Sequence, residues 1–248
     1  MHNDFIFNFK SDLSKLTIPS KLNNPFGVAI PEIARIATEE FQTYLSTSAE
    51  DWGYDFRTRP GKMFGVLVVQ KKDNSYAYLG TVSGNLSWKT PNNKLVPSVL
   101  PNSFSDLLSA GMIGLTELCR QIDSSDNPSE ITQLKATRKL KSYNLQQGIF
   151  KHSKFLNLSG EEKNVLQIFQ QSEAGNPPAA AGDCAAPKLL QFALKHQLKP
   201  IALAEFWWGM ISKNKDRKHK VFYPACENRC RPILEYMLEQ DEPKEPIL

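Results

Sequence analysis

The chain has 248 residues, of which 41% are hydrophobic and 23% charged, and its formal net charge is +4 at pH 7. This composition excludes a disordered tail and a collagen-like chain, and the length suits one or two domains that fold without disulfide bonds. The opening residues lack the apolar segment of a secretion signal, and no apolar run reaches the roughly 18 residues of a membrane span. The sequence therefore predicts a cytoplasmic protein with no membrane partner.

The first elements are predicted from hydrophobic spacing. Residues 1–30 are polar with scattered aromatics, which is typical of an extended lead-in. Apolar residues then recur at helical spacing and predict an amphipathic helix over about 31–46, followed by a loop over 47–61. Two β-branched and aromatic runs, 63–70 and 76–83, predict a hairpin of strands that are covered on both faces.

The middle of the chain, residues 103–170, predicts a helical insertion. Its stretch EITQLKATRKLKSYNLQQGIF has one narrow apolar stripe among basic residues, as in a long exposed helix. The remaining residues, 1–102 and 171–248, are expected to form the core domain.

The last third predicts a helix entered from a Pro/Gly/Ala loop (NPPAAAGDCAAPKLLQFALKH), a buried strand (LKPIALAEFWWG), a basic loop and a closing helix. The expected fold is therefore α/β, with a small mixed sheet flanked by helices in the order helix, strand, strand, helix, strand, helix.

Three cysteines are candidates for a metal site. Cys184 lies at one predicted helix start, and Cys226 and Cys230 flank another. Helix N-termini stabilise thiolates, so the three could hold zinc. The alternative is that they are small buried hydrophobes.

The element order resembles that of zinc-dependent nucleoside and base deaminases, whose motifs are H/C-x-E and P-C-x-x-C. The corresponding strings here are CAAP and PACENRC. Ala186 stands where the proton-shuttling Glu should be, and one residue is added within both parts of the second motif. Without that carboxylate, a zinc-bound water has no nearby group for its proton transfers, which argues against an active deaminase.

Aromatic and acidic residues at the end of the last strand form a second candidate site. Glu205 could be a functional acid or base, or the partner of a basic residue. Trp207 and Trp208 could stack on exposed bases, although at least one is expected in the core.

Basic residues interleaved with aromatics predict an RNA interface, although a solvated loop and helix face explain the same residues. The candidate RNA-binding residues are Trp207 and Trp208 with Lys213, Lys215, Arg217, Lys218 and Lys220 in the loop, and Arg138 and Lys139 on the insertion helix.

Longer strings resemble the N-terminal accessory region of a subgroup of RluA-type RNA pseudouridine synthases, over roughly residues 30–238. They are GKMFGVLVVQ, YLGTVSGNL, FLNLSGEEKNVLQIF, PPAAAGDCAAPKLLQFAL, LKPIALAEFWWG and FYPACENRCRPIL. The resemblance implies that rRNA or tRNA is the partner and that a synthase catalytic domain accompanies this region.

The chain departs from that family in one respect that concerns mechanism. The family's catalytic Asp lies in a motif like H-R-L-D-x-x-T-S-G, and no such string is present. The chain ends about where the catalytic domain is expected to begin, so it is either a separated piece or a stand-alone relative. These residues alone are therefore not expected to isomerise uridine.

The leading hypothesis is an accessory, RNA-engaging module without catalytic residues of its own. The two alternatives are a diverged zinc-binding, deaminase-like enzyme that uses the three cysteines, and a module that binds a protein partner through Trp207 and Trp208.

Overall fold

The computed structural model describes residues 2–48, 56, 58–84, 94–212 and 216–239. Its elements, in chain order, are η1 (His2–Phe5), β1 (Ile6–Asn8), α1 (Glu32–Ser48), β2 (Lys62–Gln70), β3 (Tyr76–Val82), α2 (Asn102–Ser124), α3 (Pro128–His152), β4 (Lys154–Leu156), β5 (Glu162–Asn164), α4 (Val165–Gln170), α5 (Ala185–Lys195), β6 (Lys199–Trp208), β7 (Phe222–Tyr223) and α6 (Glu227–Leu238). None of the helices within the described residues is both long and apolar enough to cross a bilayer.

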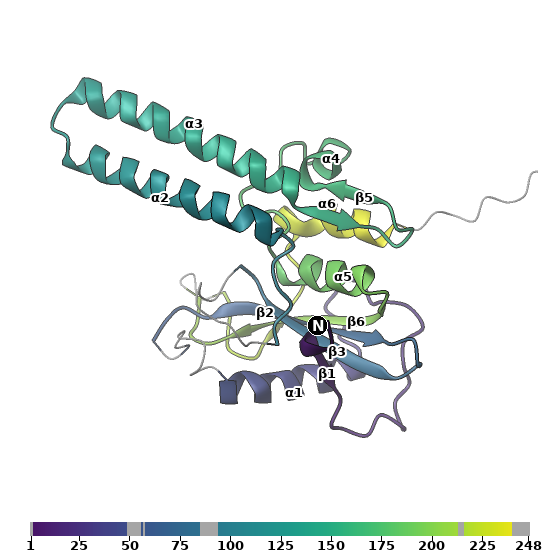
Figure 1. The fold of residues 1–248 in the computed structure, drawn as a ribbon. Coiled ribbons are helices and arrows are strands. Elements are labelled where there is room, and N and C mark those ends of the chain that lie inside the picture. The colour runs from purple at the N-terminus through teal and green to yellow at the C-terminus, as the bar shows by residue number, and fades with distance from the viewer. Residues whose placement is uncertain (1, 49–55, 57, 85–93, 213–215, 240–248) are drawn as a thin grey trace, which may run out of the picture.

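The core is a layered α/β structure, as predicted. A five-stranded sheet in the order β1-β3-β2-β6-β7 lies between α1 on one face and α5 on the other, and α6, α4 and the α2–α3 hairpin lie beyond α5 (Figure 1). The predicted order helix, strand, strand, helix, strand, helix is confirmed by α1, β2, β3, α5, β6 and α6.

Both faces of β2 are buried, which explains its continuous apolar run. Phe64, Val66 and Val68 pack in the cluster with α1, whereas Leu67 and Val69 pack in the cluster with α5. Because alternate strand residues point to opposite faces, a strand with helices on both sides needs apolar residues at nearly every position.

The sheet differs from the prediction in the direction of its strands. A mixed sheet was expected, but every pairing between the named strands is antiparallel. In this arrangement β2 runs opposite to both of its neighbours, β3 and β6, and β7 runs opposite to β6. The outer strands β1 and β7 were not predicted, since two or three residues carry no readable period.

The insertion expected over 103–170 consists of two parts. Helices α2 and α3 form a long hairpin that projects from the rest of the structure (Figure 1). The following segment folds as the small β4–β5 hairpin and α4, and its Phe155, Val165 and Phe169 belong to the same core cluster as α5 and α6. This second part is therefore core structure.

Two glycines give opposite predictions for stability. In β3, a Cβ added at Gly80 would collide with the buried ring of Phe41 on α1, whereas at Gly114, inside α2, nothing lies within 4 Å. We expect Gly80→Ala to lower the free energy of unfolding by about 1–3 kcal/mol through overpacking. Gly114→Ala should raise it by about 0.5–1 kcal/mol through helix propensity. Urea unfolding of the two variants checks both signs, and a neutral Gly80→Ala would contradict the packing of α1 on the sheet.

Candidate functional site

Helix α5 begins in close contact with β2. A Cβ at Gly65 would lie 2.8 Å from the Cβ of Ala185, so Gly65 and the small residues Ala185 and Ala186 permit this approach. Cys184, the N-cap residue, makes no side-chain capping hydrogen bond. The first N–H groups of α5 therefore need partners from other elements, because a buried donor without a partner is costly.

The strands supply those partners. The N–H of Ala185 donates to Oγ of Ser83 at 3.2 Å, and the N–H of Ala186 donates to Oε1 of Glu205 at 2.9 Å. Glu205 lies on β6 directly opposite Gly65 and is only 5% exposed. The missing side chain of Gly65 leaves space for Ala185 and Leu189 of the helix.

The environment of Glu205 favours its neutral form. Burial raises its pKa to about 7, and negative charge at Cys226 acts in the same direction. The Ala186 N–H and the Arg217 guanidinium oppose this rise. A carboxyl group with such a pKa changes charge near neutral pH, which is the property that acid–base chemistry requires.

The three predicted metal ligands converge next to Glu205. Cys184 is the N-cap of α5 and Cys226 the N-cap of α6, while Cys230 lies one turn into α6 with its N–H donating to the Cys226 carbonyl at 3.3 Å. Cys230 is fully buried in the core cluster against which the other two pack.

Hydrogen bonds between the thiols separate their pKa values. Donation from Cys184 and Cys230 to the Cys226 sulfur lowers the pKa of Cys226, and burial opposes this only in part. The pKa of Cys184 is raised because it donates to Cys226, and the pKa of Cys230 is raised because it donates to both other sulfurs. Cys226 is therefore the thiol that loses its proton most easily.

The thiols near the start of α5 are not linked to one another by disulfide bonds. All four cysteines, the distant Cys119 included, are free thiols. Among the residues that the structure describes, no group of three or more His, Cys, Asp and Glu side chains is arranged to hold a metal ion. The zinc expected at Cys184, Cys226 and Cys230 thus stays a prediction.

A buried lysine, which the sequence analysis did not single out, fastens the loop before α5 to the end of β3. Lys188 is 2% exposed, and its Nζ lies 2.9 Å from Oδ1 of Asp183. It also donates to the carbonyls of Val82 and Gly84, at 3.0 and 2.8 Å. In the sequence, Lys188 is visible only as one Lys among the apolar residues of α5. A lysine on the exposed face of a helix gives the same pattern, so the sequence does not reveal that this one is buried.

The loop between β6 and β7 is the predicted basic interface. Lys213 and Lys215 lie outside the described residues. Lys218 and Lys220 are exposed, whereas Arg217 is partly buried, with Nη1 3.0 Å from the sulfur of Met63 and its guanidinium over the Tyr223 ring.

The two tryptophans differ in exposure. Trp208 is 6% exposed, and His219 and Lys220 pack against its ring. It therefore belongs to the core, in agreement with the expectation that at least one of the two tryptophans is buried. Trp207 is partly exposed and donates from Nε1 to the Met210 carbonyl at 2.7 Å. Of the pair, Trp207 is the one whose ring reaches solvent.

The predicted basic residues of the insertion lie on α3. Lys139 is exposed, and so is Arg138, which donates from Nη1 to the sulfur of Cys119 on α2 at 3.5 Å. The hairpin therefore presents these charges away from the core.

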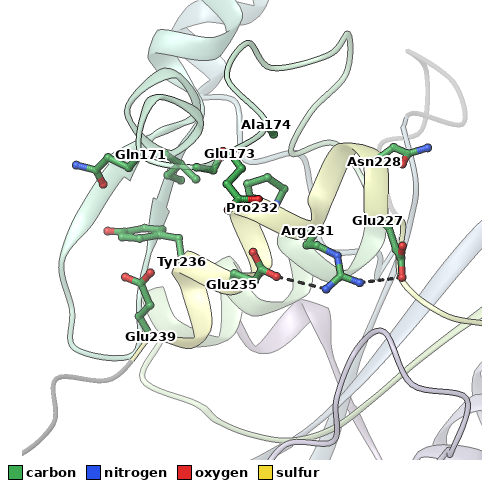
Figure 2. Close-up of a pocket in the computed structure, with 12 residues that line it drawn as sticks. Gln171, Glu173, Ala174, Glu227, Asn228, Arg231, Pro232, Glu235, Tyr236 and Glu239 are labelled. Carbon is green, nitrogen blue, oxygen red and sulfur yellow. Dashed lines mark hydrogen bonds and ion pairs between the residues drawn. The ribbon is translucent and has the colours of Figure 1, made fainter.

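A groove of about 660 Å³ along α6 has the opposite charge. Figure 2 shows Arg231 between Glu227 and Glu235, with ion pairs of 2.8 and 3.3 Å, and Glu173 and Glu239 also line the groove. Four carboxylates surround one already paired cation, so this surface repels phosphate.

No family model, curated protein or solved structure matches this chain.

The raised pKa of Glu205 predicts a pH-dependent stability. Since its folded pKa of about 7 exceeds the ordinary 4.5, the folded state binds the proton more tightly, and stability falls as pH rises through this window. Glu205→Gln keeps an acceptor for the Ala186 N–H but does not ionise. The free energy of unfolding of this variant, relative to that of wild type, should therefore rise by roughly 2–3 kcal/mol between pH 5 and pH 8. Urea unfolding of both proteins at pH 5 and pH 8, in EDTA, checks this. A stability difference between variant and wild type that does not change with pH would contradict the raised pKa of the buried Glu205 carboxyl group.

Proposed function

We propose that this chain is the RNA-engaging accessory region of an RluA-type RNA pseudouridine synthase, acting on ribosomal or transfer RNA in the cytoplasm. The resemblance of six strings distributed over roughly residues 30–238 supports this assignment. Isomerisation of uridine belongs to a catalytic domain, since these residues contain no string like H-R-L-D-x-x-T-S-G. The role proposed for this region is to hold the RNA.

The β6–β7 loop is the observation that carries the proposal. Its backbone is fixed to β6 by hydrogen bonds from Trp207 N–H to the Val221 carbonyl and from Lys220 N–H to the Trp207 carbonyl. The N–H of Lys218 donates to the Tyr223 hydroxyl at 2.8 Å. Exposed cations on a backbone that is held in this way, as at residues 218–221, lose little backbone entropy when they bind phosphates.

The distribution of charge supports a second contact surface on α3. Residues 131–160 contain six Lys and Arg and no Asp or Glu. On α3, the exposed Lys and Arg residues are Lys135, Arg138, Lys139, Lys141 and Lys151. Phosphate contacts of this kind position an RNA without reading its sequence, which suits an accessory region. The groove along α6 carries four carboxylates and is therefore not part of this basic surface.

The salt dependence of RNA binding tests the loop. We expect Lys218→Gln/Lys220→Gln to weaken binding of an unmodified tRNA transcript. It should also lower the slope of log K against log salt by roughly 1.4–1.8, since each lost phosphate contact removes about 0.7–0.9. Filter binding or fluorescence anisotropy at several salt concentrations measures both quantities.

The matched control is Lys71→Gln/Lys72→Gln, which removes the same charge at the turn after β2. That turn lies at the opposite end of the strand from Lys62, whose partner Trp208 precedes the loop. The control should leave the slope unchanged. Equal slopes for wild type and the loop variant would contradict the proposed interface, and Lys135→Gln/Lys139→Gln tests the α3 surface by the same criterion.

A further inference from the structure

Trp207 lies on a part of the sheet that extends past the start of helix α5. Its neighbours along β6, Phe206 and Trp208, pack in the cluster with α1, so the Trp207 side chain points to the opposite face, which carries α5. Its partner on β2 is Met63, two residues before Gly65, against which α5 begins. The Trp207 side chain therefore lies beyond the end of the helix, and it is partly exposed.

Two contacts with the backbone fix the orientation of the Trp207 indole ring. Its Nε1–H donates to the Met210 carbonyl at 2.7 Å. The ring also lies against Gly61, where an added Cβ would be only 2.7 Å from Cε2 of the indole. A ring that is already oriented loses little side-chain entropy when a ligand stacks on it. Because the Nε1–H is already bonded, the ring offers a ligand its face and not a hydrogen-bond donor.

The two adjacent tryptophans differ in what covers their rings. The ring of Trp208 has the His219 ring 4.4 Å away between centroids and the Lys220 ammonium 5.7 Å from its centroid. Within the described part of the chain, neither an aromatic ring nor a cation packs in this way on Trp207. Met210, to which Trp207 is bonded, is 48% exposed, so an apolar side chain adjoins the indole at the surface. An oriented aromatic ring with such a neighbour is typical of a binding surface.

A cation and a second aromatic ring lie on the same face of the sheet. Tyr223 on β7 is paired with Glu205, two residues before Trp207, so the side chains of all three point to one face. The Arg217 guanidinium lies over the Tyr223 ring, 5.0 Å from its centroid. Its Nη1 is 3.0 Å from the sulfur of Met63, the residue opposite Trp207. A nucleotide can use both groups, because its base stacks on an aromatic face and its phosphate pairs with a guanidinium.

We propose that Trp207 is a stacking platform for one unpaired nucleobase of the RNA, with Arg217 beside it for the adjoining phosphate. Bases inside a duplex are stacked on one another, so the occupant is a nucleotide of a single strand or a loop. Since the contact is made by the ring face and not by a hydrogen-bond donor, the platform accepts any of the four bases. The inference rests on the proposed RNA binding and adds to it the class of RNA, one with unpaired bases.

Binding of unpaired and paired RNA by variants of Trp207 tests the platform. The probes are an unstructured, mixed-sequence RNA of about 12 nucleotides and the same strand annealed to its complement. Trp207→Ala should weaken binding of the single strand roughly 10–100-fold and binding of the duplex less than about 2-fold, since only a free base can stack on the ring. Trp207→Phe keeps a ring face without the Nε1 donor, so it should retain most of the affinity for the single strand.

The salt dependence separates stacking from phosphate contacts. Trp207→Ala should leave the slope of log K against log salt unchanged, whereas Lys218→Gln/Lys220→Gln lowers it. The matched control is Tyr143→Ala, which removes an aromatic ring that is 57% exposed on α3 and should bind both RNAs as wild type does.

Each failure has its own signature. No loss in Trp207→Ala, an equal loss for both RNAs, or the same loss in Tyr143→Ala would overturn the platform while wild type still binds RNA with its usual salt dependence. If wild type binds neither RNA, the proposed function fails, and this inference fails with it.

A crosslink to the unmutated side chain covers the case in which Trp207→Ala does not fold. The single strand carries one 5-iodouridine, which couples to an aromatic ring stacked on it when it is irradiated with ultraviolet light. After digestion of the wild-type complex, mass spectrometry should find the coupled nucleotide on Trp207. Coupling confined to other residues would overturn the proposal independently of the variants.

Discussion

The start of helix α5 has to satisfy its N–H groups while it presses against the middle of a sheet. Gly65 and Ala185 allow the close approach, and a helix end in such a place has no water to donate to. Ser83 and Glu205 accept the first two N–H groups, and Lys188 ties the preceding loop to the end of β3. Cys184 is placed by the same packing, because it is the residue from which the helix starts.

The topology explains why the buried Glu205 and the basic β6–β7 loop lie at the same end of the strands. β3 and β6 both run opposite to β2, so they run parallel to each other and their carboxyl ends lie on the same side. Helix α5 is the last element before β6, and its N-terminus lies at that same end, since the Ala185 N–H donates to Ser83 just after β3. The basic loop begins where β6 ends. Arg217 connects the two features, since it lies over Tyr223 and its charge acts on Glu205.

Sequence patterns predicted the elements with a readable period and missed those without one. Helix α1 and strands β2 and β3 carry long apolar patterns, and the structure places them within one or two residues of the predicted bounds. The short strands β1 and β7 exist because longer neighbours offer backbone partners, which no local pattern reveals. The role of Phe155 in the core was likewise hidden, because its segment resembled the rest of a helical insertion.

The candidate site shows the difference between a motif and a geometry. Ala186 indicates a lost carboxylate when the motif is read along the chain. In space, Ala185 and Ala186 are fully buried where the helix meets the sheet, so a larger side chain there would compete with that contact. Glu205 is 19 residues away along the chain, and its position beside Ala186 follows from the register of β6 against Gly65, which a single sequence does not contain. The register of β6 on β2, and not the motif, therefore decides which carboxyl group lies beside the start of α5.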